Sequence, residues 1–126
     1  MKSINKQIVL LWMSIICVSF GVHSCKTTDK IGQEIKCENL TDGVFEGSFK
    51  GGLNYAKVKI IIKNAKISEI MILEHNASPI GKKAEVKIIE SIIAQQSTNI
   101  DAVSGATNSS HVIINAVQKA ILKSYK

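Results

Sequence analysis

The residues best suited to chemistry lie in one stretch, Asp101–Ser110, with the sequence Asp-Ala-Val-Ser-Gly-Ala-Thr-Asn-Ser-Ser. It combines a turn of small residues with the hydroxyl side chains of Ser104, Thr107, Ser109 and Ser110. A segment with the apolar spacing of a helix follows directly, over residues 111–126. The first N–H groups of a helix lack intrahelical partners, and the helix dipole is positive there. The stretch therefore predicts a loop that holds a phosphate group at a helix N-terminus.

Two predicted helices must position this loop. One covers residues 82–95 and the other 111–126, and both have apolar residues at spacings of three and four. Ser109 or Ser110 is the predicted N-cap of the second helix, because a side-chain oxygen there can accept a bond from a free N–H group. The apolar stripes consist of Ala84, Ile88 and Ile92 in the first helix and Ile113, Val117, Ala120 and Ile121 in the second.

Three predicted strands precede the helices, over residues 44–50, 55–63 and 67–74. The first two alternate between apolar and polar residues, which is typical of half-buried strands, and glycine-rich or Asn-Ala turns separate the three. The third is apolar on both faces, which favours a place in the middle of the layer or cover from helices. We expect an α+β domain: a small antiparallel sheet of three or slightly more strands, packed against two main helices.

The first 24 residues have the composition of an export signal. Lys2 and Lys6 precede an apolar run from Ile8 to Val22 of about 15 residues, whereas a membrane-spanning helix needs roughly 20. Cys25 follows a small residue just after this run. The arrangement resembles the lipobox of bacterial lipoproteins, in which the signal is cut before the cysteine and the cysteine then carries lipid. Ordinary cleavage and an uncleaved anchor are the alternatives.

The predicted organisation is therefore a signal peptide at 1–24, a lipidated Cys25 with a polar tether over 25–40, and one small domain at 41–126. Cys17 leaves with the signal and Cys37 remains alone, so an internal disulfide framework is excluded. Without Lys2 and Lys6 the chain has 14 lysines against 10 acidic residues. This mildly basic balance shows no cluster typical of nucleic-acid binders, and we expect no nucleic-acid partner.

Four segments of the chain together resemble the FMN-binding domain family, over residues 41–124. They are Asp42-Gly43-Val-Phe45-Glu-Gly47-Ser, the strand Val58–Ile62 with its turn and return, Ile80-Gly81-x-x-Ala84, and Ile100-Asp101-Ala-Val-Ser-Gly-Ala-Thr107. The family includes the flavin-carrying subunit of sodium-pumping NADH:quinone oxidoreductase and its electron-transport relatives.

This resemblance implies a covalent cofactor on Thr107. In the family, the threonine that ends the motif carries FMN as a phosphoester, and a separate, exported, magnesium-dependent flavin transferase makes the bond from FAD. By the same resemblance, Asp101, Ser104, Gly105 and Ala106 are the residues that the transferase recognises. The hydroxyl groups of Ser109 or Ser110 are expected to donate hydrogen bonds to the phosphate.

The chain departs from the family pattern at two turns. Ala77-Ser78-Pro79-Ile80 stands where members often have Glu-Thr-Pro-Gly, which leaves open which side chains meet the isoalloxazine ring. Asn64-Ala65 stands where relatives often have glycine in the second place.

Simpler roles compete with the chemical ones at several residues. From composition alone, Thr107 is a helix-capping hydroxyl. His75 and His111 are expected at the surface, because no group of ligand-type residues has metal-site spacing. Most of Phe45, Phe49 and Tyr55 are expected in the core. No nucleophile–base pair is evident, so we assign no catalytic and no metal-ligating residue.

We therefore expect an exported, membrane-anchored flavoprotein that carries electrons through covalent FMN on Thr107, outside the cytoplasm or in the periplasm. Its expected partners are a flavin transferase, the membrane through the lipid on Cys25, and redox proteins or a quinone-linked electron chain. A carrier is favoured over a complete enzyme because the sequence indicates no substrate site. The alternatives are a lipid-anchored interaction or regulatory module without flavin, and a small flavin reductase.

Overall fold

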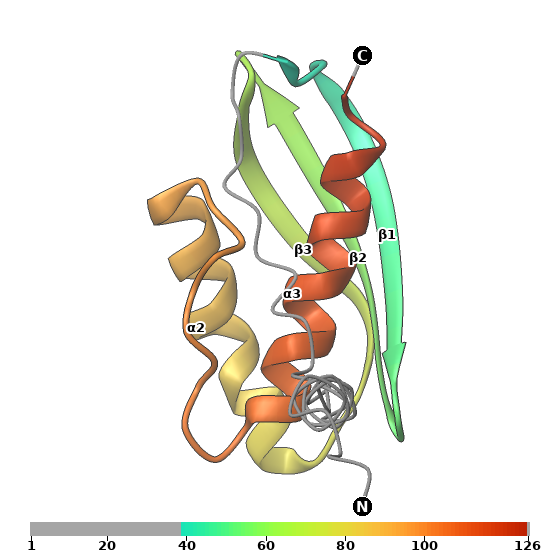
Figure 1. Ribbon diagram of the computed structural model, residues 1–126, viewed down its shortest axis with the longest axis vertical. Coiled ribbons are helices and arrows are strands. Elements are labelled where there is room, and N and C mark those ends of the chain that lie inside the picture. Colours follow the sequence, from blue (N-terminus) through green and yellow to red (C-terminus); the bar gives the residue numbers. More distant parts are fainter. Residues whose placement is uncertain (1–38, 126) are drawn as a thin grey trace, which may run out of the picture.

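The computed structural model describes residues 39–125 and shows a three-stranded antiparallel sheet with two helices on one of its faces (Figure 1). The predicted α+β class is confirmed. The predictions about the signal peptide, Cys25 and Cys37 lie outside the described residues. The elements are β1 (Gly43–Gly51), β2 (Asn54–Lys63), β3 (Lys66–Asn76), α2 (Pro79–Gln95) and α3 (Thr107–Leu122).

The core lies between the sheet and the helices. Alternation along β2 places Ala56, Val58, Ile60 and Ile62 on the covered face, where all four are buried as predicted. Helix α3 packs on β1 and β2, and α2 packs on α3 and β3. The predicted apolar stripe of each helix is buried in this core. Because a Cβ atom at Gly47 would lie 2.1 Å from the carbonyl oxygen of Ala116, β1 and α3 can approach this closely only with glycine there.

Strand β3 is an edge of the sheet, and β2 is in the middle. A place in the middle of the layer, the first of the two predicted explanations for its apolar faces, was wrong, whereas the second, cover from helices, is confirmed for one face, where α2 packs on β3. Its pairing with β2 shifts register twice, and each irregularity adds one residue to β3, at Ser68 and at Leu73. The extra residues interrupt the alternation, so apolar residues occur on both faces although Met71 and Leu73 remain exposed.

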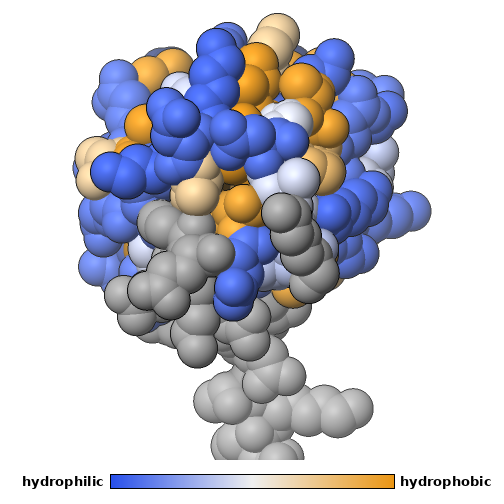
Figure 2. Space-filling model, turned by 90° about the horizontal axis from the view of Figure 1, so that it is seen from above, coloured by the Kyte–Doolittle hydropathy of each residue, from blue (hydrophilic) through white to orange (hydrophobic). Residues whose placement is uncertain are grey.

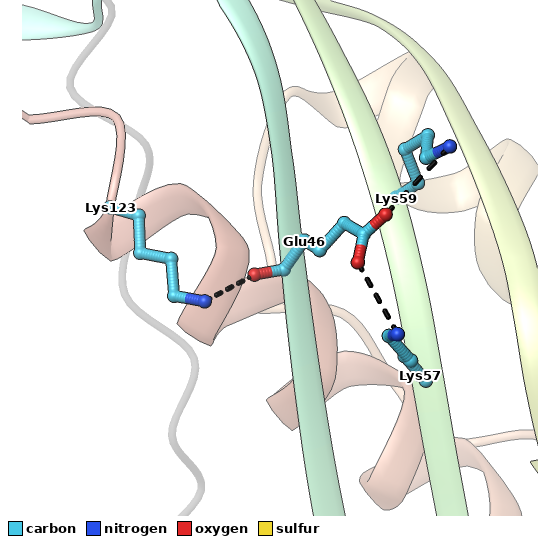
Figure 3. Close-up of polar contacts among 4 residues, drawn as sticks. All are labelled: Glu46, Lys57, Lys59 and Lys123. Atoms are coloured by element: carbon cyan, nitrogen blue, oxygen red, sulfur yellow. Dashed lines mark hydrogen bonds and ion pairs between the residues drawn. The ribbon is translucent and has the colours of Figure 1, made fainter.

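The opposite face of the sheet has no helix against it among the described residues. A carboxylate on β1, that of Glu46, lies 3.4 Å from Lys57 Nζ and 3.7 Å from Lys59 Nζ on the neighbouring strand (Figure 3). Lys123, beyond α3, donates to the Glu46 carbonyl at 2.7 Å and so occupies a free backbone group of the edge strand. These polar contacts suit a solvent-facing surface.

The two ends of the domain contain different turns. At one end, hydrophilic residues predominate and hydrophobic ones show between them (Figure 2). This end includes the β2–β3 turn and the pairing of Leu40 with Tyr125. Because Leu40 is also buried, the packed core includes this residue ahead of β1. At the other end lie the β1–β2 turn and the first residues of both helices (Figure 1). No helix of the described residues is both long and apolar enough to cross a membrane.

Candidate functional site

Helix α3 begins at Thr107, earlier than predicted. Its N-cap is Ala106, which makes no side-chain capping bond, so the prediction of Ser109 or Ser110 as N-cap was wrong. The first intrahelical bond runs from the Ser110 N–H to the Ala106 carbonyl at 2.9 Å. The N–H groups of Thr107, Asn108 and Ser109 precede that bond and have no intrahelical acceptor. A helix start without a side-chain cap leaves these donors available to a ligand.

Ser110 holds the loop against the helix. Its hydroxyl donates to the Ala106 carbonyl at 2.8 Å and accepts from the Val103 N–H at 3.0 Å. The Ala106 N–H in turn donates to the Val103 carbonyl at 2.9 Å. Ser110 is fully buried, and its hydroxyl donates one hydrogen bond and accepts another within the loop and helix start rather than to a ligand. Ser110 therefore stabilises the turn that precedes α3 and does not cap the helix, because its hydrogen-bond partners are backbone groups of Val103 and Ala106.

Gly105 opens the loop towards solvent. Its φ of +81° is in the left-handed region, which favours glycine. A Cβ atom built on Gly105 would meet nothing within 4 Å, so the backbone there faces open space. Glycine is thus required by the turn and not by crowding.

The start of α2 lies against the start of α3. Ser78 caps α2 by accepting from the Gly81 N–H at 3.2 Å, and Pro79 occupies the first turn, where its missing N–H costs nothing. A Cβ atom at Gly81 would lie 2.2 Å from Ser109 Oγ and 2.9 Å from Ala77 Cβ. The glycine of the Ile80-Gly81 motif therefore lets two helix N-termini converge. The Ser-Pro pair is a helix-start signal that would have placed α2 at Pro79 rather than at residue 82.

These elements border an open hollow of about 510 Å³, here called the Thr107 hollow. Residues 105–109 form one wall, Ser78 contributes from the cap of α2, and Leu53 and Asn54 contribute from the β1–β2 turn. None of these lining side chains is charged, so an anion would be held by N–H groups, hydroxyl groups and the positive ends of two helix dipoles.

A second hollow of about 440 Å³, the His111 hollow, adjoins the first. One wall is the face of α3 that carries Asn108, His111, Val112 and Asn115, and the other is Phe49 with residues 51–54 of the hairpin. The two hollows share three residues: Leu53, Asn54 and Asn108. Both volumes lie in the range of about 300–1,000 Å³ typical of small-molecule sites.

The structure brings together part of the predicted site. Gly105, Ala106, Thr107 and Ser109 line the Thr107 hollow, where Thr107 is exposed and Ser109 is buried. Asp101 and Ser104 are exposed on the loop that leads to it and are not among its lining residues. Exposed positions suit residues that a second protein must reach. Leu53, Asn54 and Ser78 were missed, because their proximity depends on how the hairpin and the helices pack.

His75 is buried, contrary to the expectation of a surface histidine. Its side chain is 2% exposed, and Nδ1 lies 2.7 Å from Glu85 Oε1 on α2. The residue pairs with Ala56 on the covered face of the sheet, which explains the burial. His111 is half-buried and lines the second hollow. The described residues contain no group of three or more side chains suited to hold a metal ion.

The site and fold define a small α+β domain that presents N–H groups, a glycine turn and an exposed hydroxyl to an anion at two converging helix starts. The family model described as the FMN-binding domain matches residues 52–122, more than half of the chain. The chain belongs to the FMN-binding domain family, which indicates a flavin-binding role. FMN fits the residues present, because its phosphate needs donors without competing carboxylates and its ring needs an adjoining, partly apolar hollow.

A similar protein is an uncharacterized protein of Treponema pallidum (strain Nichols), which is 29% identical over 100 residues. The alignment covers 79% of this chain and 28% of that relative. The chain thus spans less than a third of the length of the curated relative that it matches.

Proposed function

We propose that the protein carries electrons through FMN attached covalently to the hydroxyl oxygen of Thr107. The observation that carries the proposal is the position of Thr107. It is the exposed first residue of an uncapped helix, beside the left-handed turn at Gly105 and within a hollow suited to a phosphate. When bound, the flavin supplies the redox chemistry, and the chain supplies attachment and orientation.

The attachment is a phosphoryl transfer made by a separate transferase. The Thr107 hydroxyl oxygen bonds to the phosphorus that bears the riboflavin part of FAD, and the bond from that phosphorus to the pyrophosphate bridging oxygen breaks. The hydroxyl proton is lost and AMP is the leaving group, so no electrons are exchanged. Asp101 and Ser104 are exposed on the approach to Thr107, which favours their recognition by the transferase.

The chain's own groups then hold the phosphoester. The N–H groups of Asn108 and Ser109 point out of the first turn of α3, and the dipoles of α2 and α3 both favour negative charge there. Ser109 contributes a hydroxyl in the hollow, while Ser110 keeps the loop in place. Preformed donors of this kind hold an anion without rearrangement of the backbone.

Export and a lipid on Cys25 complete the proposal. The apolar run before Cys25 supports export, and a covalent bond keeps the flavin from being lost by dilution outside the cytoplasm. The proposed partners are redox proteins or a quinone-linked chain at the membrane surface. Metabolic labelling with a fatty acid tests the anchor: label that persists in Cys25→Ala would exclude lipidation there.

The experiment for the attachment is co-expression of the full chain with a flavin transferase, followed by denaturing gel electrophoresis and intact-mass measurement. We expect a fluorescent band and a mass increased by one FMN phosphoester. Thr107→Val should abolish both. Ser48→Ala, which removes an exposed hydroxyl from the uncovered face of the sheet, should retain both. A dark wild-type band, or a fluorescent Thr107→Val band, would contradict the proposal.

A further inference from the structure

We infer that the isoalloxazine ring occupies the His111 hollow, between α3 and the β1–β2 hairpin, and contacts His111 and Leu53. The inference rests on the proposed attachment at Thr107 and adds which residues surround the reactive part of the cofactor. It assigns functions to His111 and Asn115, which neither the loop motif nor the phosphate site uses, and a second function to Leu53.

Continuity with the attachment point favours this hollow. It shares Leu53, Asn54 and Asn108 with the Thr107 hollow, so a cofactor fixed at Thr107 can extend directly into it. A third hollow, lined by Lys50, Gly52, Leu53, Tyr55 and Asn76, lies on the other side of the hairpin tip and shares only Leu53 with the Thr107 hollow. A ring there would have to pass around that tip.

The spacing of residues along α3 also favours the His111 hollow as the site of the ring. Thr107 and His111 are four residues apart, so their Cβ atoms lie about 5–6 Å from each other on one face of α3. Asn108, His111 and Asn115 recur at spacings of three and four, and all line the hollow. Each carries hydrogen-bonding groups, as the pyrimidine edge of a flavin requires. The row of polar side chains leads away from the attachment point along the helix.

The opposite wall contributes apolar surface through Phe49 and Leu53. Phe49 packs against the core, and Lys119 Nζ lies 5.1 Å from the centroid of its ring. A Cβ atom at Gly51 would lie 3.1 Å from Val112 Cγ1, so the hairpin closely approaches α3 there. A flat ring with apolar faces and a polar edge suits a hollow whose lining combines the apolar side chains of Phe49, Leu53 and Val112 with polar side chains along α3.

Leu53 at the hairpin tip is 92% exposed, the highest value among the exposed large hydrophobic side chains of the described part of the chain. It lines all three hollows, and the Asn76 side chain donates to its carbonyl at 3.4 Å. Burial of such an exposed leucine against an apolar surface is favourable, because apolar area is removed from water. Contact with the ring would bury part of the Leu53 side chain and shield the ring from solvent.

The test compares flavin-loaded full-length chains that differ on the two sides of the hairpin. His111→Leu should shift the visible flavin absorption bands and change the reduction potential, and His111→Gln should restore part of both by replacing a hydrogen-bonding group. Leu53→Asn should raise quenching of flavin fluorescence by iodide several-fold. Tyr55→Leu, on the other side, is the matched control and should change none of these signals.

The outcomes separate the ring position from the attachment. The inference is overturned if the flavin spectrum, reduction potential and iodide quenching of loaded chains change with Tyr55→Leu and not with His111→Leu. That result would place the ring in the third hollow, beside Tyr55. Loaded chains indifferent to both variants would overturn it too. In each case covalent flavin would still be present by mass. A wild-type chain without flavin would instead contradict the proposed function.

Discussion

At the scale of single residues, Asp42 shows how a motif residue can act far from the site. Its carboxylate accepts hydrogen bonds at 2.9 Å from the N–H groups of Asn64 and Ala65, in the β2–β3 turn. Both turn residues have positive φ, at 52° and 57°. The carboxylate thus caps a strained turn that contains no glycine. These bonds, from Ala65 first and Asn64 second, hold the pKa of Asp42 below its usual range.

The lowered pKa makes a pH-dependent contribution to stability. Because the folded pKa is below the unfolded value of about 3.9, the stabilisation is present above that value and is lost as the pH falls through the folded pKa. We expect Asp42→Asn to unfold at a lower temperature than the wild type at neutral pH. The difference should shrink on acidification below about pH 4. Thermal unfolding followed by circular dichroism measures it, and a gap that widens in acid would contradict the capping role.

At the scale of elements, the convergence of α2 and α3 depends on Gly81. An added methyl group would overlap Ser109 Oγ, so Gly81→Ala should destabilise the domain by about 1–3 kcal/mol through overpacking. It should also lower the yield of flavin attachment, because the start of α3 would be displaced. Denaturant unfolding and the fluorescent gel measure the two effects.

The control is the double variant Gly81→Ala with Ser109→Gly, which removes the overlapping side chain. If sterics are the cause, the double variant should be more stable than the sum of the two single changes predicts. If the loss of stability in the double variant equals the sum of the two single losses, Gly81 is needed for a reason other than contact with Ser109.

Most of the helices and strands could be predicted from periodicity, but the residues at which they begin and end could not. Alternation at Ala56–Ile62 and the helical stripe through Ile113 and Val117 reflect burial, which the sequence must encode residue by residue. The start of α3 depends on Ser110 bonding to Val103 and Ala106, an interaction that competes with capping and leaves no distinct pattern.

The central place predicted for β3 and the surface position predicted for His75 were wrong for related reasons. Two extra residues in β3 interrupt its alternation and produce a sequence pattern like that of a central strand. His75 is placed on the covered face by the same register, and its partner Glu85 comes from another element. The glycine turn before α3 was predictable because its residues are contiguous in the sequence. The hollows were not, since Leu53, Ser78 and Thr107 come together only in the folded chain.

At the scale of the whole molecule, the positive ends of two helix dipoles meet at one end of a small domain, around a hollow without charged lining residues. Two helix N-termini meet there, and the lining of the Thr107 hollow contains no carboxylate. A phosphoester on Thr107 would supply the missing negative charge. A charge at a helix terminus contributes about 0.3–1 kcal/mol per helix when exposed and up to about 2 kcal/mol when partly buried.

Flavin attachment should therefore raise the thermal stability of the whole domain. For a domain of this size, about 1 kcal/mol shifts Tm by about 4–8 °C, so we expect a rise of that order in the flavin-loaded wild-type chain over the same chain produced without transferase. Because the interaction is electrostatic and partly exposed, the rise should diminish as salt is added. Differential scanning calorimetry at low and high ionic strength measures both. If the loaded and unloaded chains have equal Tm values at low salt, the helix starts do not stabilise the phosphate. If the loaded chain has the higher Tm but salt does not reduce the difference, the added stability comes from burial of the ring against Leu53 and Phe49.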